Sequence, residues 1–208
     1  MTRYDRFEGD DGQPVRIHQE DFCQALGVVP EMKYQNEGGP NLKACFDLLR
    51  KVTRPSAPEV LRLLDAVVFN ALIGNHDAHA KNFSLLYEGS TLTMAPLYDL
   101  LSTAVYENLT LNMAMKLGSK YKFTQVEARH WEQFAKAAGL SKAQTKRRVL
   151  RIAKDLPVVA RRLEASPLFV GQPIIDRIVA LIEQRSALTM RRLLEGGDKV
   201  EEQDHEES

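Results

Sequence analysis

The residues best suited to chemistry lie in one polar segment, Asn75-His-Asp-Ala-His-Ala-Lys-Asn82, between two apolar stretches. Asp77 precedes Asn82 by five positions, which is the separation in the catalytic loop of protein kinases. In that loop the Asp accepts the proton of the attacking hydroxyl, and the Asn ligates Mg²⁺. The spacing therefore predicts phosphoryl transfer, with Asp77 as the general base and Asn82 as a metal ligand.

Phosphoryl transfer needs a second hard oxygen ligand, because Mg²⁺ prefers carboxylate and phosphate oxygens. Asp99 supplies one, 17 residues after Asn82 and directly after an expected hairpin, as the metal-binding Asp of kinases does. His79 and Lys81 belong to the same loop and are candidates to contact the phosphates of ATP. We therefore expect Asp77, Asn82 and Asp99 to converge on one cleft.

Two other classes of function compete with this interpretation. The doublet His76-Asp77, with His18 upstream and Asp99 downstream, suggests a metal-dependent phosphohydrolase, whose site needs neutral imidazoles on a transition metal. Such a doublet is expected within a helix, whereas Gly74 and Asn75 predict a loop here. The third class is a lobe that binds a protein partner without catalysis. Metal preference separates the kinase from the hydrolase, because a hydrolase would retain manganese, iron or zinc, whereas a kinase lobe binds Mg²⁺ weakly without nucleotide.

The expected elements place this loop between a buried helix and a hairpin. Apolar periodicity predicts helices over 21–27, 41–49 and 57–73, and Gly74 ends the last of these. Residues 83–87 and 91–95 flank Gly89 as two strands of a hairpin. From His130 onward the pattern is helical, with an N-cap at Ser141, a new helix beginning at Pro157 and a long amphipathic helix over 173–194. The fold class predicted is mostly α, with a small β-hairpin at the active cleft.

Several motifs occurring together and in order resemble the carboxy-terminal part of HipA-type serine/threonine kinases, the toxins of HipA/HipB toxin–antitoxin modules. The resemblance is dense over residues 1–120 and compatible over the helical remainder. The matching segments are Arg3-Tyr-Asp-Arg6, Arg16-Ile-His-Gln-Glu-Asp-Phe-Cys-Gln-Ala-Leu-Gly27, Lys33-Tyr-Gln, Gly38-Gly-Pro, Ile73-Gly-Asn-His-Asp-Ala-His-Ala-Lys-Asn-Phe-Ser84 and Ala95-Pro-Leu-Tyr-Asp-Leu-Leu-Ser102.

The resemblance implies a role for each matched position. The residue matching Asp77 is the catalytic base, those matching Asn82 and Asp99 hold Mg²⁺, and those matching His79 and Lys81 lie along the ATP phosphates. The segment 1–6 matches the hinge, in which Tyr4 meets adenine, and 73–102 holds the catalytic loop, the hairpin and the metal-binding Asp. Implied partners are a HipB-like DNA-binding antitoxin and a protein of translation, such as an aminoacyl-tRNA synthetase, as the phosphorylated substrate.

The resemblance covers only one lobe, residues 1–197. The 208 residues contain no Gly-rich phosphate loop and no strand carrying an ATP-binding Lys. We therefore expect a split subunit, a truncated gene product or a fragment, whose amino-terminal lobe is separately encoded in the first case. Because both missing groups stabilise the transition state, we expect weak ATP binding and undetectable catalysis by this chain alone.

Charge is balanced overall, at 28 basic and 28 acidic residues, but unevenly distributed. Residues 198–208 hold six acids and one base, which predicts an acidic disordered tail. Eight bases between Lys142 and Arg162 face one acid, and we interpret them as a solvated helix face in preference to a nucleic-acid surface. No stretch is apolar enough for a membrane span or a signal peptide, so the expected location is the cytoplasm.

Overall fold

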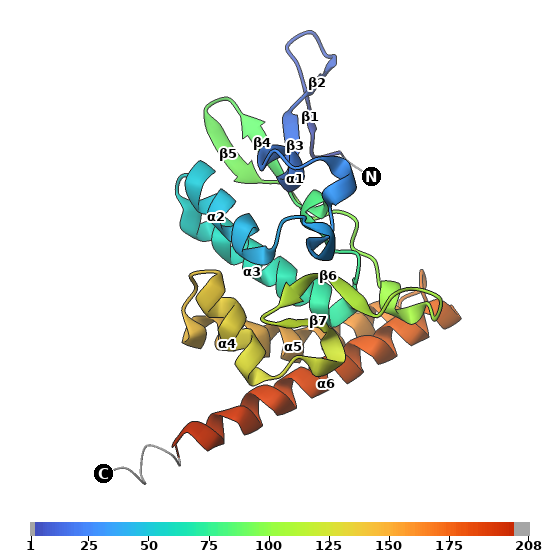
Figure 1. Ribbon diagram of the computed structural model, residues 1–208. Helices are drawn as coiled ribbons and strands as arrows, with labels where there is room; N and C mark the ends of the chain where they lie inside the picture. Colours follow the sequence, from blue (N-terminus) through green and yellow to red (C-terminus); the bar gives the residue numbers. More distant parts are fainter. Residues whose placement is uncertain (1–2, 202–208) are drawn as a thin grey trace.

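The described part of the amino-terminal half combines short strands with three α-helices. The computed structural model describes residues 3–201, and side chains as far as residue 195. Strands β1 (Arg6–Glu8) and β2 (Pro14–Arg16) form an antiparallel hairpin that projects from the body (Figure 1). A separate antiparallel sheet has the order β3-β4-β5, formed by His18–Asp21, Ser84–Glu88 and Thr91–Met94. The expected hairpin is therefore present, and β3 extends it to three strands.

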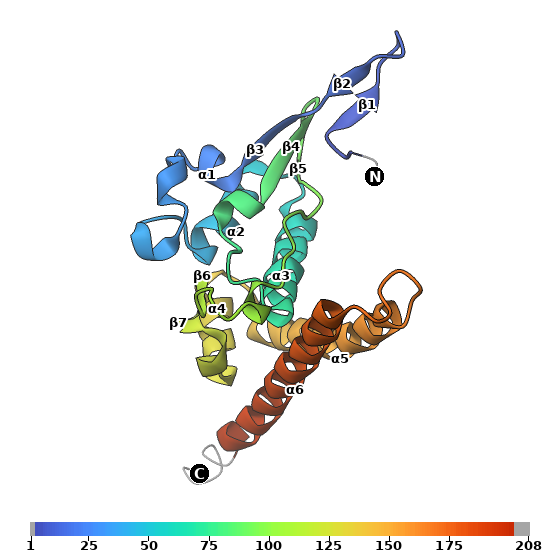
Figure 2. The same ribbon diagram turned by 90° about the vertical axis from the view of Figure 1, so that its right-hand side faces the viewer.

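The helices form the bulk of the molecule. Helix α1 (Phe22–Ala25) follows β3, and α2 (Leu42–Val52) packs against α3 (Ser56–Ile73). The strands β6 (Asn112–Leu117) and β7 (Lys120–Lys122) lead to α4 (Ala128–Ala137), α5 (Lys142–Glu164) and α6 (Pro173–Glu201). In both ribbon views α4, α5 and α6 lie at the end of the molecule opposite the β1–β2 hairpin (Figures 1 and 2).

The hydrophobic core surrounds α3. Leu63, Leu64 and Leu72 are no more than 1% exposed, and they share one cluster with the buried Phe46 of α2 and Phe83 before β4. A helix that is apolar on most of its faces is stable only inside a packed core. Because α3 is held on several sides, its carboxyl end is a rigid support for the loop that follows.

The local signals at the starts of α1 and α2 and at the end of α3 are confirmed. The side chain of Asp21 accepts a hydrogen bond from the amide of Gln24 at the start of α1, and that of Asn41 accepts one from Ala44 at the start of α2. Gly74 ends α3 with a φ of 77°, a conformation that glycine adopts without steric cost.

The expectation that a helix begins at Pro157 is wrong, because α5 continues through that position from Lys142 to Glu164. A proline at the first turn and a proline inside a helix share the same local sequence signature. Packing on both sides decides the outcome: Ala153 before the proline and Ala160 after it are buried, and Leu156 packs against both hydrophobic clusters. These contacts outweigh the lost hydrogen bond.

We expect Pro157→Ala to raise the free energy of unfolding by about 1–3 kcal/mol, because alanine restores the amide donor that proline lacks within a helix. Urea denaturation of the wild type and the variant measures the change. An unchanged or lowered stability would mean that the proline does not destabilise α5 in its packed setting.

The structure bears on two expectations drawn from the charge distribution, the acidic tail and the basic stretch. Helix α6 runs to Glu201 and includes the first four residues of the 198–208 segment, while residues 202–208 lie outside the described part. In the basic stretch, Arg148 pairs with Asp65, Arg161 with Glu183, and Lys142 with Glu132. These ion pairs support the interpretation as a solvated helix face. Among the helices of residues 3–201, none has the length and apolar character that crossing a bilayer requires.

Candidate active site

A buried asparagine organises the polar loop after α3. Asn75 is 4% exposed, and its amide nitrogen donates to Asn70 Oδ1 at 2.9 Å and to the backbone oxygen of Asp99 at 3.0 Å. Its amide oxygen accepts from the backbone N–H of Asp77 at 3.2 Å. One side chain therefore ties the end of α3 to both acidic candidates. Sequence reasoning assigned Asn75 no such role, because its partners Asn70 and Asp99 are not part of the loop.

Asp77 presents its carboxylate to a cavity. The side chain is 43% exposed, and it lines a cavity of about 420 Å³ together with Tyr34, Thr103, Met113 and Tyr121. The hydroxyl of Tyr34 donates to Asp77 Oδ1 at 2.7 Å. An accessible carboxylate held at one oxygen has the geometry that a general base requires.

Asn82 and Asp99 meet, as the sequence predicts. Asn82 lies in the 3₁₀ helix Ala80–Asn82, and its amide nitrogen donates to Asp99 Oδ2, while its amide oxygen accepts from the backbone N–H of His79 at 3.0 Å. Asp99 has a φ of 54° and is the one non-glycine residue with positive φ in the described range 3–201. Such backbone geometry is sparsely populated and recurs at functional sites.

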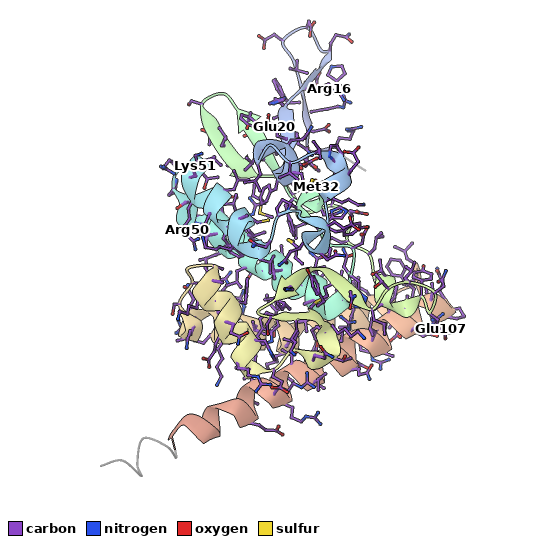
Figure 3. All side chains as sticks on the ribbon, in the orientation of Figure 1. Arg16, Glu20, Met32, Arg50, Lys51 and Glu107 are labelled. Carbon is purple, nitrogen blue, oxygen red and sulfur yellow. The ribbon has the colours of Figure 1, made fainter. Side chains whose placement is uncertain are left out.

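A second cavity, of about 900 Å³, is lined by Tyr4 and Lys81 together. Tyr98, Ser84 and Arg16 also line it, and Figure 3 shows Arg16 on the projecting hairpin. The Tyr98 hydroxyl donates to the Lys81 backbone oxygen at 2.6 Å. Asp99 follows Tyr98 along the chain. Its backbone oxygen accepts a hydrogen bond from the side chain of Asn75, which precedes Asp77 by two residues. The pair Asn82–Asp99 therefore connects the walls of the two cavities.

His79 is enclosed by the loop and borders neither cavity within the described part of the chain. It is 4% exposed, its ring lies edge-on to Tyr34 with centroids 5.4 Å apart, and its Nε2 is 3.9 Å from Asp77 Oδ1. Both ring nitrogens are buried and lack a hydrogen-bond partner among residues 3–195. Burial lowers the pKa of His79, so the ring is neutral at neutral pH.

A buried arginine of α6 braces the loop from below. Arg185 is 8% exposed, donates to the Ala71 backbone oxygen at 2.8 Å, and contacts His76 Nε2 at 2.8 Å. The other ring nitrogen of His76 donates to the Thr110 backbone oxygen at 2.9 Å, a tautomer fixed by the guanidinium, which can only donate. Burial lowers the pKa of Arg185 to about 10. With both nitrogens engaged, His76 is not available as a metal ligand, which argues against the phosphohydrolase hypothesis.

We expect the protein to lose stability as the pH falls below about 6.5, because burial lowers the pKa of His76 and His130 in the folded state. Protonation would set His76 against Arg185 and remove the bond in which His130 Nδ1 accepts from the Glu127 amide at 2.9 Å. As the pH falls, these histidines bind protons in the unfolded chain before they do so in the folded protein. Their contribution to the free energy of unfolding is therefore fully present above the unfolded pKa near 6.5, and below it the free energy of unfolding declines by up to about 1.4 kcal/mol per pH unit for each histidine.

Urea denaturation between about pH 7.5 and pH 5.5 tests this expectation, with His130→Gln as the variant that should reduce the slope. A free energy of unfolding independent of pH in this window would contradict it.

Known proteins resemble this chain in sequence and in fold. Residues 1–160 match the HipA-like C-terminal domain family. The chain is 47% identical over 190 residues to a Sinorhizobium fredii protein provisionally named a kinase, covering 90% of this chain and 45% of that protein. It is 30% identical over 169 residues to the serine/threonine-protein kinase toxin HipA of Shewanella oneidensis, covering 76% of this chain and 39% of the toxin.

A solved structure gives the same answer for the fold. The complex of HipA, HipB and operator DNA from Shewanella oneidensis contains a chain that matches with a TM-score of 0.83 and 25% identity, covering 93% of this chain and 49% of that one. The expected mostly α fold is confirmed, and the described residues form three small antiparallel sheets where the sequence predicted one hairpin. The chain spans less than half the length of each of these relatives.

Proposed function

This chain belongs to the HipA-like C-terminal domain family, and from that premise we propose that it is the part of a serine/threonine protein kinase that carries the general base and the magnesium ligands. The observation that carries the proposal is the contact of Asn82 with Asp99 beside the accessible carboxylate of Asp77. Asn82 contacts Asp99, and the backbone of Asp99 is linked through the Asn75 side chain to the backbone of Asp77. Asp77 lines one of two cavities, and two cavities suit a reaction with two substrates.

Each cavity has a role in this mechanism. A serine or threonine hydroxyl of the protein substrate enters the smaller cavity. Asp77 accepts the proton of this hydroxyl while the hydroxyl oxygen forms a bond to the γ-phosphorus of ATP. The bond from that phosphorus to the bridging oxygen of ADP breaks. ATP occupies the larger cavity, where Tyr4 meets the adenine and Lys81 lies along the phosphates, with His79 within the loop behind them.

Asp99 and Asn82 would hold Mg²⁺, since a carboxylate and an amide in contact are a donor set that suits a hard cation. Asp99 is exposed, and its carboxylate is therefore accessible to a cation. The Asn82 amide presents its nitrogen to Asp99, so ligation through its oxygen requires that amide to turn. When bound, the metal neutralises charge developing on the transferred phosphoryl group.

The proposal extends to the setting of the reaction. As a HipA-like toxin, the kinase acts in the cytoplasm on a protein of translation, such as an aminoacyl-tRNA synthetase, and is neutralised by a HipB-like antitoxin. The HipA–HipB complex of Shewanella oneidensis supports this partner by analogy. Because the sequence shows no Gly-rich phosphate loop and no strand that carries an ATP-binding Lys, we expect full activity only with an amino-terminal lobe that supplies them.

The test is transfer of labelled phosphate from Mg²⁺-ATP to the proteins of a bacterial lysate. One sample is the chain alone, and the other is the chain joined to the remaining part of the Sinorhizobium fredii relative. We expect protein labelling by the joined form, abolished by a chelator of Mg²⁺, and little or none by the chain alone.

The alternatives predict different products. Release of phosphate to water without protein labelling would indicate a hydrolase, and capture of an antitoxin without any turnover would indicate a binding lobe. Either result from the joined form would overturn the proposal. Robust labelling by the chain alone would show that these residues need no further lobe.

A further inference from the structure

Tyr34 contacts the candidate base although it lies 43 residues before it in the chain. Its hydroxyl donates to Asp77 Oδ1 at 2.7 Å, and none of the hydrogen bonds among residues 3–195 involves Oδ2. The motif that contains it, Lys33-Tyr-Gln followed by Gly38-Gly-Pro, has no role in the proposed reaction so far. Its position next to the Asp77 carboxylate indicates a role in the reaction.

The backbone around Tyr34 is fixed by a tight turn. The amide of Gly39 donates to the Tyr34 backbone oxygen at 2.9 Å. A Cβ atom on Gly39 would lie 2.3 Å from the Met32 backbone oxygen and 2.7 Å from that of Tyr34, so only glycine fits there. The side chain of Gln35 anchors the same turn to β6 by accepting from the Lys116 amide at 2.8 Å.

The ring of Tyr34 is fixed as well. It meets the buried ring of His79 edge-on, with centroids 5.4 Å apart, and the ammonium of Lys33 lies 4.8 Å from its centroid. Burial, followed by the hydrogen bond to Asp77, raises the pKa of Tyr34 to about 12. The phenol is therefore protonated at neutral pH and acts as a donor toward Asp77.

We propose that Tyr34 is a positioning residue that orients the Asp77 carboxylate so that Oδ2 faces the acceptor hydroxyl. The inference rests on the proposed function and deepens it by assigning the Lys33-Tyr-Gln and Gly38-Gly-Pro motifs to the acceptor side of the site. A different role, in which Tyr34 blocks the acceptor, fits the structure less well. The Asp77 side chain is 43% exposed with Tyr34 in place, and both residues line the wall of the same cavity.

The variant Tyr34→Phe tests this, because it removes only the hydroxyl and retains the ring against His79. In the joined kinase we expect kcat to fall on the order of 10-fold, with the KM values for ATP and for the protein substrate unchanged. A fall in kcat without a change in KM is the readout that a merely structural role of Tyr34 would not give. The other groups close to this contact, His79 and Lys33, are unchanged in the variant.

Tyr106→Phe is the matched control, since Tyr106 is 51% exposed and borders neither cavity in the described chain. It should retain wild-type kcat, and thermal unfolding should show both variants folded. A Tyr34→Phe enzyme with wild-type kcat would overturn the positioning role, as would a lower KM for the protein substrate, which indicates a blocking role. A wild-type joined form that transfers no phosphate would instead overturn the proposed function and this inference together.

Discussion

Asp77→Asn is expected to lower kcat for phosphate transfer by about 10²–10⁴-fold, the contribution typical of a general base. The amide has the shape of the carboxylate and can accept the Tyr34 hydrogen bond through its oxygen, but it cannot take up the proton of the acceptor hydroxyl. The side chain is 43% exposed, so the free energy of unfolding should change by less than about 1 kcal/mol. Binding of Mg²⁺-ATP should be retained.

The measurement is the initial rate of phosphate incorporation by the joined kinase, together with the thermal unfolding midpoint. Asp155→Asn provides the matched control, because Asp155 is exposed on α5 and takes part in none of the ion pairs of the described residues. A rate for Asp77→Asn within a factor of a few of the wild type would exclude Asp77 as the base.

Local sequence carried the information for the starts of α1 and α2, for the end of α3 and for the contact of Asn82 with Asp99. Caps act over three or four residues, and the apolar stripes of α2 and α3 have a period that is visible in the sequence. The contact of Asn82 with Asp99 could be expected because the kinase spacing of Asp77, Asn82 and Asp99 already implied a loop, a hairpin and a return to the loop. The roles of these residues in catalysis stay predictions.

Contacts between distant segments could not be read in the same way. Tyr34 reaches Asp77 across 43 residues, and Arg185 reaches His76 across 109. Nothing in the local pattern of either segment marks the partner. An arginine in an amphipathic helix indicates a solvated face, and Arg185 is buried only because α6 packs against the carboxyl-terminal end of α3 (Figure 2). The helix at Pro157 could not be predicted for the same reason, because tertiary packing decides whether α5 continues past this residue.

The backbone at Asp99 constrains how its role can be tested. At a φ of 54° most side chains are strained, whereas Asn and Asp tolerate this region through short-range hydrogen bonding. Alanine at this position would therefore combine a loss of charge with a loss of backbone stability. Asparagine separates the two, because it keeps the conformation and removes only the charge.

Asp99→Asn is accordingly expected to abolish the Mg²⁺ dependence of ATP binding and to lower kcat by about 10²–10³-fold, while the unfolding midpoint stays close to that of the wild type. Calorimetric titration of the joined kinase with ATP, with and without Mg²⁺, measures the first effect. Wild-type protein should bind ATP more tightly when the metal is present, and the variant should bind it equally in both conditions. Asp155→Asn again serves as the control and should behave as the wild type. If Asp99→Asn retains the metal-dependent gain in ATP affinity, the ligand for Mg²⁺ lies elsewhere, and the contact between Asn82 and Asp99 is a structural brace of the loop.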